Sequence, residues 1–224
     1  MNSGVFFLLI LLLQFDKFNP TNMQHYLKRF EEAVKLNWDR PCFCNYRGET
    51  FTFGQTAEQI ARLHIFYESA GLKPGMKVAI CAKNSARWAI SLFSINTFGA
   101  VAVPILADFH PESVNSLVDH SESIALITDT DIWKKLDIKK MPNIKAVVST
   151  AHFSLLYSAS EAVSQAHDCL EEHFSQKYPN GFSKEDVCYP DGNDKELAII
   201  NYTSGTTSAP KGVMLRYECI SANV

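Results

Sequence analysis

The chain has 224 residues, of which 46% are hydrophobic, and its 24 acidic and 21 basic residues give a formal net charge of −3. This length and composition suffice for one large domain with a substantial core. No concentrated Lys/Arg face is present, so nucleic acid is not expected as a partner. The six cysteines and the histidines lack metal-ligand spacing, which indicates reduced thiols in a cytoplasmic enzyme and histidines with structural roles.

The chain begins with an apolar run over residues 5–13. This run is shorter than the stretch of about 20 residues that a membrane-spanning helix needs. No Lys or Arg precedes it and no small-residue cleavage site follows, which argues against a signal peptide. We expect residues 1–22 to be an apolar leader ahead of a start at Met23, with peripheral contact at the inner face of a membrane left open.

From residue 52 onward, helix and strand signals alternate as they do in an α/β fold. Thr52 and Gln55 predict a capping box for a helix that runs to Ala70 and is ended by Gly71. The apolar patterns predict further helices over 85–98, 111–120 and 154–177, and strands over 78–82, 100–105, 124–128, 145–149 and 197–202. The Pro/Gly-containing segment 178–194 is expected to be an exposed connection. The repeated unit predicts a largely parallel sheet flanked by helices.

One segment indicates a particular binding chemistry. It is YTSGTTSAPKGV, from Tyr202 to Val213, and it follows the apolar run at 197–200. Glycine lets a backbone approach phosphate oxygens, hydroxyl and amide groups donate to them, and a lysine ammonium supplies positive charge. A buried strand followed by this turn therefore favours a polyphosphate site. Turn composition alone leaves open a solvated Ser/Thr/Gly linker. A Walker-type loop is rejected, because Pro210 and Gly212 occupy the positions of its second Gly and its Ser/Thr.

The whole segment resembles the phosphate-loop signature of the adenylate-forming (AMP-binding) enzymes, Y-T-S-G-[ST]-T-G-x-P-K-G-V, with Ser208 in place of one Gly. The resemblance continues in GLKPGMKVAI at 71–80, in Asn84-Ser85 with Trp88, and in FGAVAVPI at 98–105. The resemblance covers residues 23–224, and within the family the sequence is most similar to long-chain fatty-acid–CoA ligases (acyl-CoA synthetases). It implies the N-terminal subdomain of the adenylate-forming fold, incomplete here: an N-terminal part of the AMP-binding domain, with its phosphate loop at 202–213 and no C-terminal domain.

The resemblance also implies a reaction. ATP and a fatty acid would form an acyl-adenylate with loss of pyrophosphate, and coenzyme A would then take the acyl group. Mg²⁺ is implied with ATP, but no metal ligand is identified in this chain. The implied phosphate-binding residues are Thr203, Ser204, Gly205, Thr206, Thr207, Lys211 and Gly212, and Lys211 is the candidate catalytic residue.

The sequence leaves three hypotheses for the chain. It is a truncated, inactive portion of such a ligase, a non-catalytic remnant or partner-binding module that retains the fold, or part of an adenylating ligase for another carboxylate. We also expect strand 197–202 to expose an apolar edge, through which copies of the chain would associate.

Overall fold

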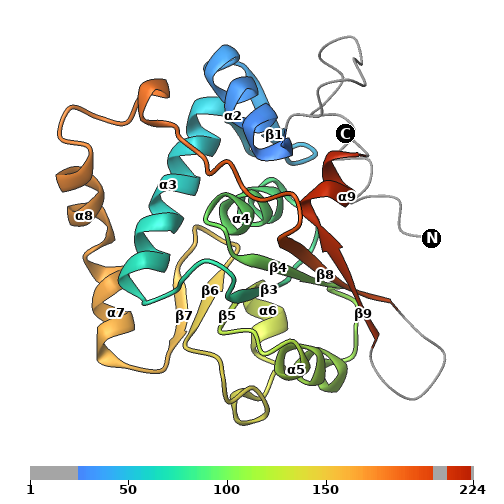
Figure 1. Cartoon of the computed structure of the whole chain (residues 1–224). Helices are drawn as coiled ribbons and strands as arrows, with labels where there is room; N and C mark the ends of the chain where they lie inside the picture. Colours follow the sequence, from blue (N-terminus) through green and yellow to red (C-terminus); the bar gives the residue numbers. More distant parts are fainter. Residues whose placement is uncertain (1–24, 204–210, 223–224) are drawn as a thin grey trace.

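The computed structural model describes residues 25–203 and 211–222, which form a seven-stranded sheet with helices on both faces, and a separate two-stranded hairpin (Figure 1). The order across the sheet is β7-β6-β5-β3-β4-β8-β9. The bounds are β3 Lys77–Cys81, β4 Val101–Ile105, β5 Ala125–Thr128, β6 Ala146–Ser149, β7 Leu155–Ser158, β8 Leu197–Thr203 and β9 Lys211–Arg216. Strands β6, β5, β3, β4 and β8 are parallel, whereas β7 and β9 run antiparallel to their neighbours. The predicted largely parallel α/β sheet is confirmed.

Strand β3 shows why helices cover both faces of the sheet. Its residues Val78 and Ile80 pack into a cluster with α2 (Tyr26–Leu36), α3 (Phe53–Ser69) and α4 (Ala86–Thr97). The alternate residues, Ala79 and Cys81, pack on the other face with α5 (Pro111–His120) and beside α6 (Thr130–Trp133). Successive side chains of a strand point to opposite faces, so a strand buried on both sides is apolar throughout. No helix among the described residues has the length and apolar character needed to cross a bilayer.

The predicted helix starts at Thr52 and Ser85 are confirmed. The Thr52 hydroxyl accepts from the Gln55 amide while the Gln55 side chain accepts from the Thr52 amide, so α3 has the full capping box. The Ser85 hydroxyl accepts from the Trp88 amide and caps α4. Gly71 follows α3 with φ of +78°, a left-handed conformation that glycine adopts at little cost.

The predicted long helix over 154–177 is wrong. Its first part is strand β7, which pairs with β6 through Val147 and Tyr157, and the rest forms α7 (Glu161–Asp168) and α8 (Leu170–Lys177). The Ser160 side chain accepts from the Val163 amide, so a new helix begins there rather than continuing from β7. The sequence patterns did not predict α2, the β1–β2 hairpin (Pro41–Cys44 and Thr50–Thr52), α6, the short helices η1 (Ile138–Lys140) and η2 (Lys184–Asp186), or β9.

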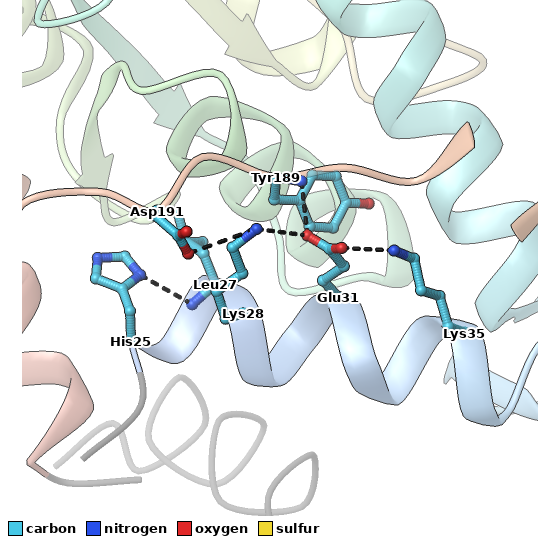
Figure 2. Close-up of polar contacts among 7 residues, drawn as sticks. All are labelled: His25, Leu27, Lys28, Glu31, Lys35, Tyr189 and Asp191. Atoms are coloured by element: carbon cyan, nitrogen blue, oxygen red, sulfur yellow. Dashed lines mark hydrogen bonds and ion pairs between the residues drawn. The ribbon is translucent and has the colours of Figure 1, made fainter. Parts of the chain in front are cut away.

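The segment over 178–194, predicted to be an exposed connection, is partly buried. Val187 and Tyr189 are only 2% and 5% exposed, and they join the core beneath α2. The Tyr189 amide donates to Glu31 Oε2 over 2.8 Å. Lys28 donates to the same oxygen over 3.2 Å, and Lys35 donates to Glu31 Oε1 over 2.6 Å (Figure 2). We call these three donors and the carboxylate the Glu31 cluster; it fastens the segment that leads into β8 onto α2.

The N-terminal residue of α2, Tyr26, is held by Asn96 on α4. Tyr26 donates its hydroxyl proton to Asn96 Oδ1 over 2.6 Å, and the Asn96 amide group donates to the Ala198 carbonyl of β8 over 2.9 Å. The Tyr217 hydroxyl donates to the Asn96 carbonyl, and the Tyr26 amide donates to Ser221 Oγ over 3.3 Å. Because Asn96 is fully buried, these bonds satisfy a polar group that would otherwise be costly in the core. They hold α2, α4, β8 and α9 (Tyr217–Ser221) together.

Candidate phosphate-binding site

The candidate site is built on the hairpin of β8 and β9. The two strands pair antiparallel from Leu197 opposite Arg216 to Thr203 opposite Lys211. Of the predicted site residues, the structure thus brings Thr203, Lys211 and Gly212 together where the hairpin loop departs. Ser204, Gly205, Thr206 and Thr207, and with them Ser208, lie outside the described residues.

The β9 strand also corrects the expected apolar edge. Strand 197–202 is not an edge, because β9 is paired along it. The sheet ends instead at β9, where the side chains of Val213 and Met214 are 47% and 69% exposed.

Lys211 is exposed at the first position of β9. None of the ion pairs formed within residues 25–203 and 211–222 uses its ammonium group. A compact cation therefore stands at one end of the predicted phosphate loop, available to an anion.

Gly212 has a steric role that its motif does not predict. It lies opposite Tyr202, and a Cβ at this position would stand 2.8 Å from Ile200 Cγ2 and 3.3 Å from Tyr202 Cε1. The first distance is too short for real carbon atoms, so any side chain at residue 212 would displace one of these neighbours. Glycine at this position lets two large side chains of β8 fold over the backbone of β9.

Tyr202 fixes the hairpin to the rest of the domain. Its side chain is 6% exposed and packs on the α5 face of the sheet. Its hydroxyl oxygen lies 2.7 Å from Nδ1 of His120, the last residue of α5, and the two rings meet edge to face with their centroids 5.8 Å apart. Burial raises the pKa of Tyr202, which keeps the phenol neutral and able to donate. Because 82 residues separate the two partners, no local sequence signal pointed to His120.

The chemistry available at this site is electrostatic. The exposed ammonium of Lys211 and the closely packed, side-chain-free Gly212 follow the loop, and β8 is held by Asn96 on one face of the sheet and by His120 on the other. Within the described part of the chain, no group of three or more His, Cys, Asp or Glu side chains could hold a metal ion. The arrangement suits the neutralisation of a bound anion by preorganised groups.

Comparison with known proteins gives concordant matches. The family described as AMP-binding enzyme matches residues 30–224. A long-chain-fatty-acid–CoA ligase of Salmonella typhimurium is 25% identical over 219 residues, which are 92% of this chain and 39% of that enzyme. A probable chloroplastic acyl-activating enzyme 16 of Arabidopsis thaliana is 29% identical over 182 residues, which are 75% of this chain and 24% of that protein. The chain thus spans well under half the length of these relatives.

Solved structures show the same fold. An anthranilate CoA ligase in complex with anthranoyl-AMP superposes with a TM-score of 0.69 at 17% identity, over 87% of this chain and 34% of the other. A long-chain-fatty-acid-CoA ligase from Archaeoglobus fulgidus superposes with a TM-score of 0.68 at 18% identity, over 92% of this chain and 39% of the other. The sheet and its helices match the N-terminal subdomain of these enzymes. The chain therefore belongs to the AMP-binding enzyme family.

Proposed function

We propose that the polypeptide to which this chain belongs activates a fatty acid as its acyl-adenylate, with ATP, and transfers the acyl group to coenzyme A. The observation that carries the proposal is the β8–β9 hairpin, in which Thr203 and Lys211 pair at the base of a loop with the family's phosphate-loop sequence. The names of relatives, such as the long-chain-fatty-acid–CoA ligase of Salmonella typhimurium and the long chain acyl-CoA synthetase 1 of Arabidopsis thaliana, support a fatty acid as the substrate.

The first step is difficult because a carboxylate anion must attack the α-phosphate of a polyanionic nucleotide. Preorganised donors and cations reduce this repulsion and stabilise the charge that moves onto the leaving pyrophosphate. We assign Thr203, Ser204, Gly205, Thr206, Thr207 and the backbone of Gly212 to the β- and γ-phosphates. Lys211 contributes positive charge at the end of the loop. Mg²⁺ bound with ATP would supply further neutralisation, and no residue of this chain is proposed as its ligand.

The assay is ATP–pyrophosphate exchange in the longest natural polypeptide that carries this sequence. We expect exchange with a long-chain fatty acid such as palmitate. Exchange with anthranilate alone would instead indicate a ligase for another carboxylate, and no exchange with any carboxylate would favour a non-catalytic module. The family resemblance implies that charged groups needed for adenylation lie in a further part of the polypeptide, and loss of one such preorganised charge costs about 10²- to 10³-fold in rate. We therefore expect the 224-residue chain by itself not to form acyl-adenylate.

Lys211→Ala tests the role of the lysine. We expect this change to slow adenylation much more than thioester formation from preformed acyl-adenylate, because pyrophosphate has left before the thiol attacks. Lys195→Ala, which removes another exposed lysine just before β8, is the matched control and should leave both steps unchanged. Equal losses in both half-reactions for Lys211→Ala would mean that the lysine supports the fold instead.

We also propose a reducing, cytoplasmic location. Cys42, Cys44, Cys81, Cys169 and Cys188 form no disulfide bond, which is compatible with a compartment where cellular thiols keep disulfides reduced. Peripheral membrane contact would rest on residues 1–22, which lie outside the described residues. Cell fractionation with and without these residues tests it: loss of membrane-bound protein on their deletion is the expected result if they make this contact.

A further inference from the structure

We propose that His120 is a positioning residue for the phosphate loop: it holds the Tyr202 side chain in place, and Tyr202 in turn fixes the backbone at both ends of the loop. This inference rests on the proposed function for its link to catalysis. Its structural part stands on the hydrogen bond between His120 and Tyr202 and on the packing of Tyr202 against Gly212.

The hydrogen bond gives the Tyr202 ring one defined position. The hydroxyl belongs to a side chain that is only 6% exposed, and His120 Nδ1 is its partner at 2.7 Å. A buried hydroxyl that loses its partner carries a desolvation penalty, so the pair resists separation. The edge-to-face contact of the two rings adds a second preference for the same geometry.

The position of the Tyr202 ring is transmitted to the two loop ends by covalent and steric contact. Tyr202 immediately precedes Thr203, the last residue of β8. Across the hairpin, its ring lies against the backbone of Gly212, the residue after Lys211, where a Cβ would stand 3.3 Å from Tyr202 Cε1. A change in the Tyr202 side chain therefore shifts both the strand that enters the loop and the strand that leaves it. Small misplacements of this kind matter in catalysis, since about 1 Å can cost about 10²-fold in rate.

The first arm of the test uses the 224-residue chain and amide hydrogen exchange. His120→Ala and Tyr202→Phe should each raise exchange at residues 200–202 and 211–213 about fivefold, the effect of one lost hydrogen bond, and leave β3 and β5 unchanged. The double variant should exchange no faster than either single one. His120→Asn, which keeps a hydrogen-bonding atom near Nδ1, should restore most of the protection. His173→Ala on α8, across the sheet from β9, is the control (Figure 1).

Unchanged exchange in the hairpin, equal acceleration across the whole sheet, or additive effects in the double variant would each overturn the proposal. Tyr202→Phe keeps the ring and its packing, so it tests the hydrogen bond even if His120→Ala folds poorly.

The second arm uses the longest natural polypeptide and the two half-reactions. We expect His120→Ala to lower the adenylation rate about tenfold, within the range for misplaced groups, with thioester transfer unchanged. An active wild type whose His120→Ala form adenylates at the normal rate would overturn the positioning role. If no carboxylate supports ATP–pyrophosphate exchange by the wild type, the proposed function is refuted instead. Hydrogen exchange in the hairpin would then decide the role of His120.

Discussion

Replacing Glu31 by Gln should destabilise the domain by about 1.5–3 kcal/mol at pH 7, the range for hydrogen bonds to a charged group. Glu31 is 8% exposed, and its carboxylate accepts from Lys35 over 2.6 Å, the Tyr189 amide over 2.8 Å and Lys28 over 3.2 Å (Figure 2). Glutamine can still accept from Tyr189, but its NH₂ group faces an ammonium. The side chains of Lys28 and Lys35 are 23% and 38% exposed and can turn to water. The loss should therefore stay below the about 3–5 kcal/mol of a fully buried pair.

The effect should depend on pH in a defined direction. Burial opposes ionisation of Glu31, but the hydrogen bonds from Lys35, Tyr189 and Lys28 outweigh it, so the pKa of this carboxyl is lowered. The unfolded chain, with a glutamate pKa near 4.5, therefore binds this proton more readily than the folded chain. The stabilisation is complete above that pH and is lost as pH falls through the lower, folded-state pKa. The difference between wild type and Glu31→Gln should shrink below a pH of about 4.5.

Urea unfolding of the 224-residue chain between pH 7 and pH 3 measures this difference. Glu172→Gln on α8 is the control, because its exposed carboxylate accepts from Gln176 of the same helix, and it should change stability by less than about 0.5 kcal/mol. Equal urea midpoints for Glu31→Gln and wild type at pH 7, or a gap that stays constant with pH, would refute the reasoning.

Three further predictions concern the core and the hairpin. Gly212→Ala should destabilise the chain by about 1–3 kcal/mol through overpacking against Ile200. The double variant Gly212→Ala/Ile200→Ala should lose less free energy of unfolding than the sum of the two single losses, and additive losses in urea unfolding would contradict the contact. Burial lowers the pKa of His64 to about 4 from a usual value of 6.5. Wild-type stability should therefore fall as pH decreases from 6.5 towards 4, because only the unfolded chain binds this proton, and His64→Gln should flatten that slope; an unchanged slope in thermal melts would count against it. Met214→Lys should reduce concentration-dependent association in sedimentation experiments, because Met214 is 69% exposed on the edge strand β9. Identical sedimentation of the wild type and Met214→Lys would exclude this edge as the surface through which copies associate.

The elements that the sequence predicted correctly carry local signals. Thr52 with Gln55 and Ser85 mark helix starts that depend on neighbours three residues away, and short apolar runs mark the buried parallel strands. The expected helix over 154–177 failed because Leu155–Ser158 pair with β6 as a strand, and the apolar pattern of 154–177 taken alone does not show this pairing. Strand β9 was missed in the same way, because its partner β8 lies across the loop of the hairpin.

In the candidate site, too, the local motif was predicted and the contacts between distant residues were not. The motif predicted Thr203, Lys211 and Gly212 as site residues; the structure places them side by side at the base of the hairpin, and their binding of phosphate stays a prediction. The contacts that support them join residues far apart in the chain: His120 with Tyr202 across 82 residues, and Glu31 with Tyr189 across 158. A single sequence contains no signal for such pairs, because either partner alone resembles an ordinary surface or helix residue.

The attachment of α2 has a consequence for synthesis on the ribosome. The residues that hold α2 are Asn96, Tyr189, Tyr217 and Ser221, and the Asn96 side chain also bonds to β8. Three of these four residues are synthesised well over a hundred residues after Tyr26. Until those residues emerge, the apolar side of α2 has only part of its final contacts. Contacts between distant residues also slow folding, because a long loop must close before they form. We therefore expect α2 to be among the last elements to become resistant to protease during translation, although it is among the first to be made.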